Sequence, residues 1–269
     1  MTDIPHEGAL THLSATETRV ASALARPRRI AIACVLALSG LGWAALGLMA
    51  ADADIWIALC QPLGAGGGVD LVLVLAMWTA MALAMMLPTA GPMILTYAEI
   101  ADTAARKHEP AASPLVLAAG YLTVWLGFAA VATALQSVLT QLAMLDAGRA
   151  SPLLAGAIFL AAGLYQFSKL KHACLTLCQR PFPFFFANWT AEPRGVFLLG
   201  LRQGLYCLGC CWAMMLVMLA AGAMNVVWMA VLGIVMTIEK MTTTARFSQA
   251  VGIVFVAIGL GFAAMILVR

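Results

Sequence analysis

Sulfur-containing side chains are concentrated in one apolar stretch of the chain, residues 203–218. At about 100° per residue, six polar or sulfur-containing side chains of this stretch fall on one face of an α-helix. The members of this face are Gln203, Cys207, Cys210, Cys211, Met214 and Met218. Three cysteines and two methionines on one face could bind a metal ion.

Thiolates and thioethers are soft ligands that select Cu(I), and they also bind zinc or iron–sulfur centres where enough thiolates are present. The spacing differs from that of closed zinc sites, which use two separated pairs of ligands. The residues therefore favour copper, as Cu(I), over zinc or iron. The alternative is that cysteine and methionine only fill space between packed helices.

A second pair of cysteines, Cys174 and Cys178, follows in the segment 169–195. If this segment begins as a helix, the two thiols lie one turn apart and can share one ion. His172 is close in sequence but not on their face. The alternative is that the pair consists of two unrelated, reduced cytosolic thiols.

Two other segments offer possible ligands at matching depth. Met81 and Met85 are one turn apart in an apolar stretch, although methionine stripes often serve packing alone. Glu239 lies near the end of another apolar stretch. Three roles are open for it: a functional carboxylate, a solvated group or the partner of Lys240. We expect Met85 and Glu239 to converge with Cys207 in the half of the membrane that faces the cytoplasm.

The composition defines the elements that must position these residues. The 269-residue chain is 63% hydrophobic and 10% charged, whereas soluble domains carry about 25% charged residues. A transmembrane helix needs about 20 mostly apolar residues, and continuous apolar runs exclude the alternating pattern of an outer-membrane barrel. The sequence predicts an all-α bundle of about seven transmembrane helices, at residues 30–49, 69–98, 114–142, 152–168, 196–221, 225–241 and 251–268.

The distribution of Lys and Arg predicts the orientation, because cationic loops stay in the cytoplasm. With a cytoplasmic N-terminus, the cytoplasmic side receives Arg106, Lys107, Arg180 and Arg194. Residues 1–29 are polar and are expected to form a disordered cytoplasmic tail. Residues 169–195 are expected to lie on the inner surface of the membrane. We predict a multi-pass protein of the bacterial cytoplasmic membrane.

Several short segments, among them those with Met85, Cys174, Cys178, Cys207, Cys210 and Glu239, resemble a known bacterial family. This is the family of predicted metal-binding integral membrane proteins called domain of unknown function 2182. The resemblance spans residues 70–245 and is most specific in the cysteine-rich string. It is carried by Ala84 to Pro88 with Pro92 and Met93, Tyr165 and Gln166 with Lys169 to Lys171, Cys174 and Cys178, Gly204 to Trp212, and Met224 to Lys240. It implies a metal-binding protein with several membrane spans and implies no reaction.

The predicted function is soft-metal binding in metal transport, or in delivery to a membrane metalloenzyme. Cys174 and Cys178 would capture the ion, and Cys207, Cys210 and Cys211 would hold it. One alternative is a dithiol and disulfide exchange protein using Cys207 and Cys210. Another is a non-catalytic subunit of a larger membrane complex.

Other function classes have little support in the sequence. No catalytic cluster of carboxylates and no phosphate-binding loop occurs, which argues against an enzyme. The net charge of +3 comes with basic residues in short loops, which argues against nucleic acid as a partner. The expected surroundings are the lipid bilayer and, as a possible partner, another membrane protein.

Overall fold

A computed structural model describes residues 27–51, 68–107, 109–142, 144–146, 149–221, 225–242 and 244–267. Most of the predicted tail, residues 1–26, lies outside these ranges. The helices are α2 (Pro27–Ala51), α4 (Gly68–Met81), the π-helix η1 (Ala82–Met86), α5 (Leu87–Thr89), α6 (Gly91–Arg106), α7 (Pro114–Gln141), α8 (Pro152–Tyr165), α9 (Lys169–Gln179), α10 (Pro181–Ala187), α11 (Pro193–Ala221), α12 (Val226–Met241) and α13 (Ala245–Leu267). An antiparallel pair of two-residue strands, β1 (Leu145–Asp146) and β2 (Arg149–Ala150), precedes α8. The predicted all-α fold is confirmed.

Within the described ranges, five helical segments are long and apolar enough to cross a membrane, namely Arg28–Ala51, Leu71–Thr89, Pro114–Gln141, Pro193–Ala221 and Ala245–Leu267. A sixth span results if α8 and α9, which meet at 65°, count as one broken span. The predicted span at residues 225–241 corresponds to α12, which has 16 residues and is short for a full crossing. The chain is a multi-pass helical membrane protein, and the predicted count of about seven is approximate.

The break between α8 and α9 has a local cause at Ser168. This residue is in an extended conformation, and its hydroxyl accepts a hydrogen bond from the backbone N–H of Lys171. A side-chain cap of this kind begins a new helix because it satisfies an N–H group that has no partner within the helix. The segment 169–195, which we expected to lie on the membrane surface, therefore contains the helices α9 and α10.

The predicted span at residues 69–98 is divided in the structure. After α4 the backbone passes through the π-turn η1 and the short α5, and α6 then continues to Arg106. Pro88 and Pro92 have no backbone N–H, so they interrupt the ladder of helix hydrogen bonds. The carbonyl of Met86 accepts from the backbone N–H of Ala90 at 3.1 Å and also from the hydroxyls of Tyr121 and Thr89, at 3.0 and 2.8 Å. This bend brings Thr89 and Met93 toward the cysteine-rich helix α11.

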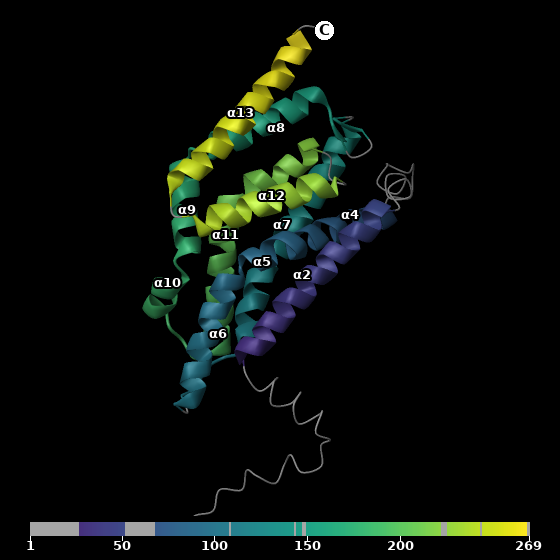
Figure 1. The fold of residues 1–269 in the computed structure, drawn as a ribbon. Helices are drawn as coiled ribbons and strands as arrows, with labels where there is room; N and C mark the ends of the chain where they lie inside the picture. The colour runs from purple at the N-terminus through teal and green to yellow at the C-terminus, as the bar shows by residue number, and fades with distance from the viewer. Residues whose placement is uncertain are drawn as a thin grey trace, which may run out of the picture.

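Glycines allow the central helices to approach closely. A Cβ atom on Gly200 of α11 would collide with the carbonyl oxygen of Leu117 on α7, and one on Gly120 would collide with that of Phe197. Gly156 and Gly259 stand in similar close contact where α8 meets α13. Small residues at such crossings bring helix backbones together in membranes. These contacts place α11 at the centre of the bundle (Figure 1).

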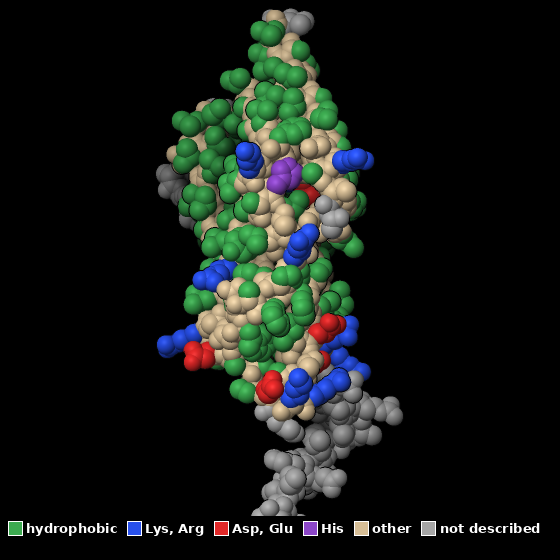
Figure 2. All heavy atoms as spheres, turned by 90° about the vertical axis from the view of Figure 1, so that its left-hand side faces the viewer, with side chains coloured by type: hydrophobic (Ala, Val, Ile, Leu, Met, Phe, Trp, Pro, Cys, Tyr) green, Lys and Arg blue, Asp and Glu red, His purple; other side chains and the backbone are tan. Residues whose placement is uncertain are grey.

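The helices α9 and α10 lie at one side of the bundle (Figure 1). Figure 2 looks onto this side and shows Lys and Arg side chains spread over it, while the part toward α8 and α13 is hydrophobic. The cytoplasmic position of α9 and α10 stays a prediction.

Candidate metal centre

A small cavity of about 20 Å³ lies where helices α5, α6, α7, α9, α11 and α12 meet. Two of the predicted ligands, Cys178 of α9 and Cys207 of α11, line this cavity together. The remaining lining residues are Thr89, Ala90, Met93, Tyr121, Gln203 and Lys240. The structure thus brings one cysteine of each predicted group to the same place.

Cys207 has the most polar surroundings of the sulfur groups. Its side chain is 2% exposed, and its Sγ accepts a hydrogen bond from Lys240 Nζ at 2.9 Å. The hydroxyl of Tyr121 lies 3.0 Å from the same sulfur. An ammonium group at this distance favours the thiolate form, which is the form that binds metals.

Cys210 and Cys211 are buried beside this pair. Their sulfur atoms are 3.3 Å apart, and Cys210 Sγ also donates to the carbonyl oxygen of Cys207 at 3.1 Å. Cys210 and Cys211 do not line the cavity.

Cys174 lies one turn before Cys178 on α9, as the spacing predicted. It packs against Gly209 of α11, where an added Cβ would lie 2.6 Å from Cys174 Sγ. Tyr165 donates a hydrogen bond from its hydroxyl to the carbonyl of the same glycine. Cys174 is partly exposed and outside the cavity.

Glu239 is part of a separate polar network. Its carboxylate forms a buried ion pair with Lys171 of α9, with 2.9 Å between Nζ and Oε2, and accepts from the Ser248 hydroxyl. The two charged side chains are 1% and 2% exposed. Of the alternatives for Glu239, pairing with Lys240 is not observed, and the carboxylate does not line the cavity. Its role as a metal ligand stays a prediction.

The methionines are buried but are not gathered at the cavity. Met81, Met85 and Met214 are at most 2% exposed. Met85 lines a different, apolar hollow of about 330 Å³ between η1, α2 and α12. Met93, just after the proline bend, is the methionine that lines the cavity with the cysteines. The expected convergence of Met85 and Glu239 with Cys207 is therefore not present.

Lys240, which the sequence offered only as a partner for Glu239, lines the cavity. Its ammonium donates to Thr89 Oγ1 at 2.7 Å as well as to Cys207. An ionisable residue in an apolar helix is a signal for a functional site. Lys240 is such a residue, but the sequence could not show that its side chain is directed to Cys207.

In the described part of the chain, no group of three or more His, Cys, Asp or Glu side chains is arranged to hold a metal ion. What the cavity offers is a pair of thiols, a nearby thioether and a cation. Such a donor set fits a soft ion of low coordination number and does not fit zinc, which takes four ligands in structural sites.

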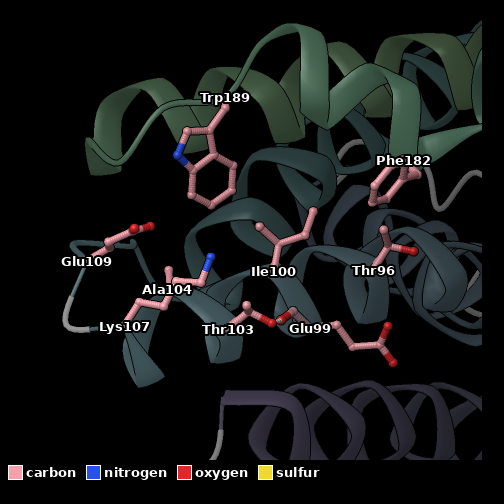
Figure 3. A pocket seen from close by; sticks show the side chains of 9 residues that line it. All are labelled: Thr96, Glu99, Ile100, Thr103, Ala104, Lys107, Glu109, Phe182 and Trp189. Atoms are coloured by element: carbon pink, nitrogen blue, oxygen red, sulfur yellow. Dashed lines mark hydrogen bonds between the residues drawn. The ribbon is translucent and has the colours of Figure 1, made fainter.

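A larger hollow of about 410 Å³ lies between α6 and the region of α10, and no sulfur group lines it. Figure 3 shows Trp189 and Phe182 on one side of it, facing Ile100 and Thr96 of α6. Glu99 at its edge pairs with Arg28, with 3.4 Å between the charged atoms. It has no soft ligand and is not a candidate for a copper site.

Comparison with known families agrees with the chemistry of the cysteine cavity. Residues 75–262 match the family PpoB2, described as copper chaperone. The chain belongs to this copper chaperone family. Every residue that lines the cavity is inside the matched range, whereas α2 and the N-terminal tail are outside it. No curated protein and no solved structure matches the chain.

Membership of the copper chaperone family confirms part of what the sequence predicted. The function is related to copper, and the predicted preference for this metal agrees with the family. The particular domain family named from the sequence motifs stays a prediction. The oxidation state of the copper and the residues that bind it are not defined by the match.

Proposed function

We propose that the chain binds a single Cu(I) ion between Cys178 and Cys207 and passes it to a copper-requiring membrane protein. The observation that carries this proposal is the shared cavity. One cysteine from α9 and one from α11 line the same small space, in a member of a copper chaperone family. Copper is thus the cargo of the protein.

The cavity suits one soft ion in size and in chemistry. Its volume of about 20 Å³ is close to that of one small sphere, since a single water needs at least about 10–15 Å³. Two thiolates supply the soft ligands that Cu(I) selects. Met93 lies on the cavity wall as a possible third, weaker ligand.

The order of the cysteines suggests a path for the ion. Cys174 and Cys178 are partly exposed on α9, Cys178 and Cys207 share the cavity, and Cys210 and Cys211 are buried on α11. Transfer along this row requires only that one thiolate replaces another, with a proton passing to the thiolate that leaves. We infer that Cys174 captures the ion at the cytoplasmic face and that the cysteines of α11 hold it, in the cytoplasmic membrane of a bacterium.

The proposal predicts that copper binding depends on both cavity cysteines. After loading with Cu(I) under a reductant, the detergent-purified protein should retain about one copper ion per chain, as the size of the cavity allows. The variants Cys207→Ser and Cys178→Ser should lose most of it, because a hydroxyl is a poor ligand for a soft ion. Elemental analysis after desalting provides the measurement.

The matched control is Cys34→Ser, which changes a cysteine of α2 outside the cavity and should leave the copper content unchanged. Full retention of copper in both cavity variants would contradict the proposal. A mobility shift that depends on oxidation, without bound metal, would favour the exchange of disulfides at Cys207 and Cys210. Neither copper nor such a shift would favour a packing role in a larger complex.

A further inference from the structure

The cavity that Cys178 and Cys207 share has a positive charge and an unpartnered hydrogen-bond donor. Lys240 contributes the ammonium group, whereas the hydroxyls of Thr89 and Tyr121 on the cavity wall donate to the carbonyl of Met86. Gln203 is 3% exposed, and its side-chain nitrogen has no hydrogen-bond partner among the described residues. No Asp or Glu lines the cavity. A space with an ammonium group and a free amide N–H group favours contents with a net negative charge.

The charge of Lys240 is not cancelled by the acidic residue next to it. Glu239 precedes Lys240 in sequence, but its carboxylate is directed to Lys171 at 2.9 Å and to Ser248. Glu239, Ser248 and Lys171 form a network of their own, in which the charges of Glu239 and Lys171 neutralise each other. The ammonium of Lys240 therefore acts on the cavity and on Cys207, at 2.9 Å, as an unbalanced positive charge.

We propose that Lys240 makes this site selective for a monovalent soft cation over a divalent one such as Zn(II). The inference rests on the proposed binding of metal by Cys178 and Cys207. Two thiolates with Cu(I) form a complex of charge −1, which the ammonium of Lys240 brings to zero. The same thiolates with Zn(II) are neutral, and Lys240 would leave a net charge of +1 inside the protein.

A net charge in a buried site is costly because the surroundings cannot solvate it as water does. Lys240 thus discriminates between ions by charge, while the two sulfur atoms discriminate by softness. Each thiol that binds gives up its proton to solvent. Lys240 does not bind the ion, so it is a specificity-determining residue that acts through its charge.

The test compares affinities for Cu(I) and Zn(II), each added alone, in detergent-purified protein and in the variant Lys240→Met. Competition with a chromophoric chelator for each ion gives the two dissociation constants. We expect the preference for Cu(I) over Zn(II) to fall by about ten- to a thousandfold, the range by which a charge at this distance shifts the equilibrium of a neighbouring ionised group. Cu(I) binding should weaken, and Zn(II) binding should strengthen or stay constant.

Two further variants serve as controls. Lys240→Arg keeps the charge and should keep most of the preference for Cu(I). Lys169→Met removes an exposed positive charge of α9 and should leave both affinities unchanged. If Lys240→Met fails to fold, Lys240→Gln replaces it, because an amide can still donate to Thr89.

The outcomes separate this inference from the proposed function. If the unaltered protein binds Cu(I) in a way that depends on Cys207, and Lys240→Met leaves the ratio of the affinities unchanged, only the role of Lys240 is overturned. A parallel loss of both affinities overturns it too, because a general loss of binding is not a loss of selectivity. If the unaltered protein binds no Cu(I), both proposals are overturned.

Discussion

Glu239 and Lys240 are neighbours on α12 but point to different parts of the molecule. Glu239 is joined to Lys171 and Ser248, whereas Lys240 contacts Cys207 and Thr89. Successive residues of a helix are about 100° apart, so two adjacent charged groups need not share surroundings. We infer that Glu239 holds α9 against α12 and that Lys240 acts on the metal site.

At the scale of single residues, Glu239→Gln should destabilise the fold and leave the metal site intact. Removal of one partner leaves Lys171 as a buried, unpaired charge, which costs about 3–5 kcal/mol. Chemical or thermal unfolding in detergent measures this loss, and elemental analysis measures the copper that the folded protein retains.

The double variant Lys171→Met with Glu239→Gln provides the control, because it removes both charges together. It should be less destabilised than the sum of the single variants, since no unpaired charge is left. Loss of copper from a Glu239→Gln protein of unchanged stability would show instead that the carboxylate binds the metal.

At the scale of the elements, the site depends on how closely α9 packs against α11. Gly209 permits the contact with Cys174, and the Gln179 side chain at the end of α9 donates to the carbonyls of Glu239 and Thr242, at 2.9 and 2.8 Å. The helix α9 carries Cys178, so its position decides whether Cys178 reaches Cys207. Movement of α9 would open or close the pair of thiols.

Gly209→Ala should therefore weaken copper binding although it changes no ligand of the cavity. The new Cβ would lie 2.6 Å from Cys174 Sγ, and overpacking of this kind costs about 1–3 kcal/mol. If α9 moves away to relieve it, the affinity for Cu(I) should fall by about tenfold, which corresponds to about 1.4 kcal/mol. A chelator competition measures the change.

Gly127→Ala is the matched control on α7, because nothing lies within 4 Å of the added Cβ. It should leave the affinity unchanged. Unchanged affinity in Gly209→Ala as well would show that α9 accommodates the methyl group without moving Cys178.

At the scale of the whole molecule, the predicted orientation rests on the positions of Lys and Arg. Lys and Arg side chains are scattered over the side that α9 and α10 form (Figure 2), and Cys178 of α9 lines the cavity. An ion that arrives at this side would meet the partly exposed Cys174 and Cys178 of α9 before the buried cysteines of α11. The orientation therefore decides from which side copper is captured.

Labelling of introduced cysteines tests the orientation. Lys169→Cys on α9 should react with a membrane-impermeant maleimide in inside-out vesicles and not in right-side-out vesicles. Leu142 follows the opposite end of α7, and its side chain is 64% exposed. Leu142→Cys should react in right-side-out vesicles and not in inside-out vesicles. The parent protein gives the background, and the same sidedness for both positions would contradict the predicted topology.

The sequence by itself determined the class of the molecule and the residue types of the candidate site. Lipid requires long apolar helices because backbone polar groups must be satisfied internally, so composition and length predict the spans. Residue type predicts soft-metal binding, and the one-turn spacing of Cys174 and Cys178 holds in α9. These properties are local, which is why they can be predicted from the chain.

Only the tertiary structure decided which of these groups meet. The sequence places a residue at a depth along its helix but does not name its neighbours. Met85 lines a different hollow, although its predicted depth in the membrane matched that of Cys207. The bends at Ser168 and Pro88 bring Cys178 and Met93 to the site of Cys207. Lys240 reaches the same sulfur because of how α12 is rotated. Contacts between distant segments depend on the packing of all the helices together, and that packing cannot be predicted from any single helix.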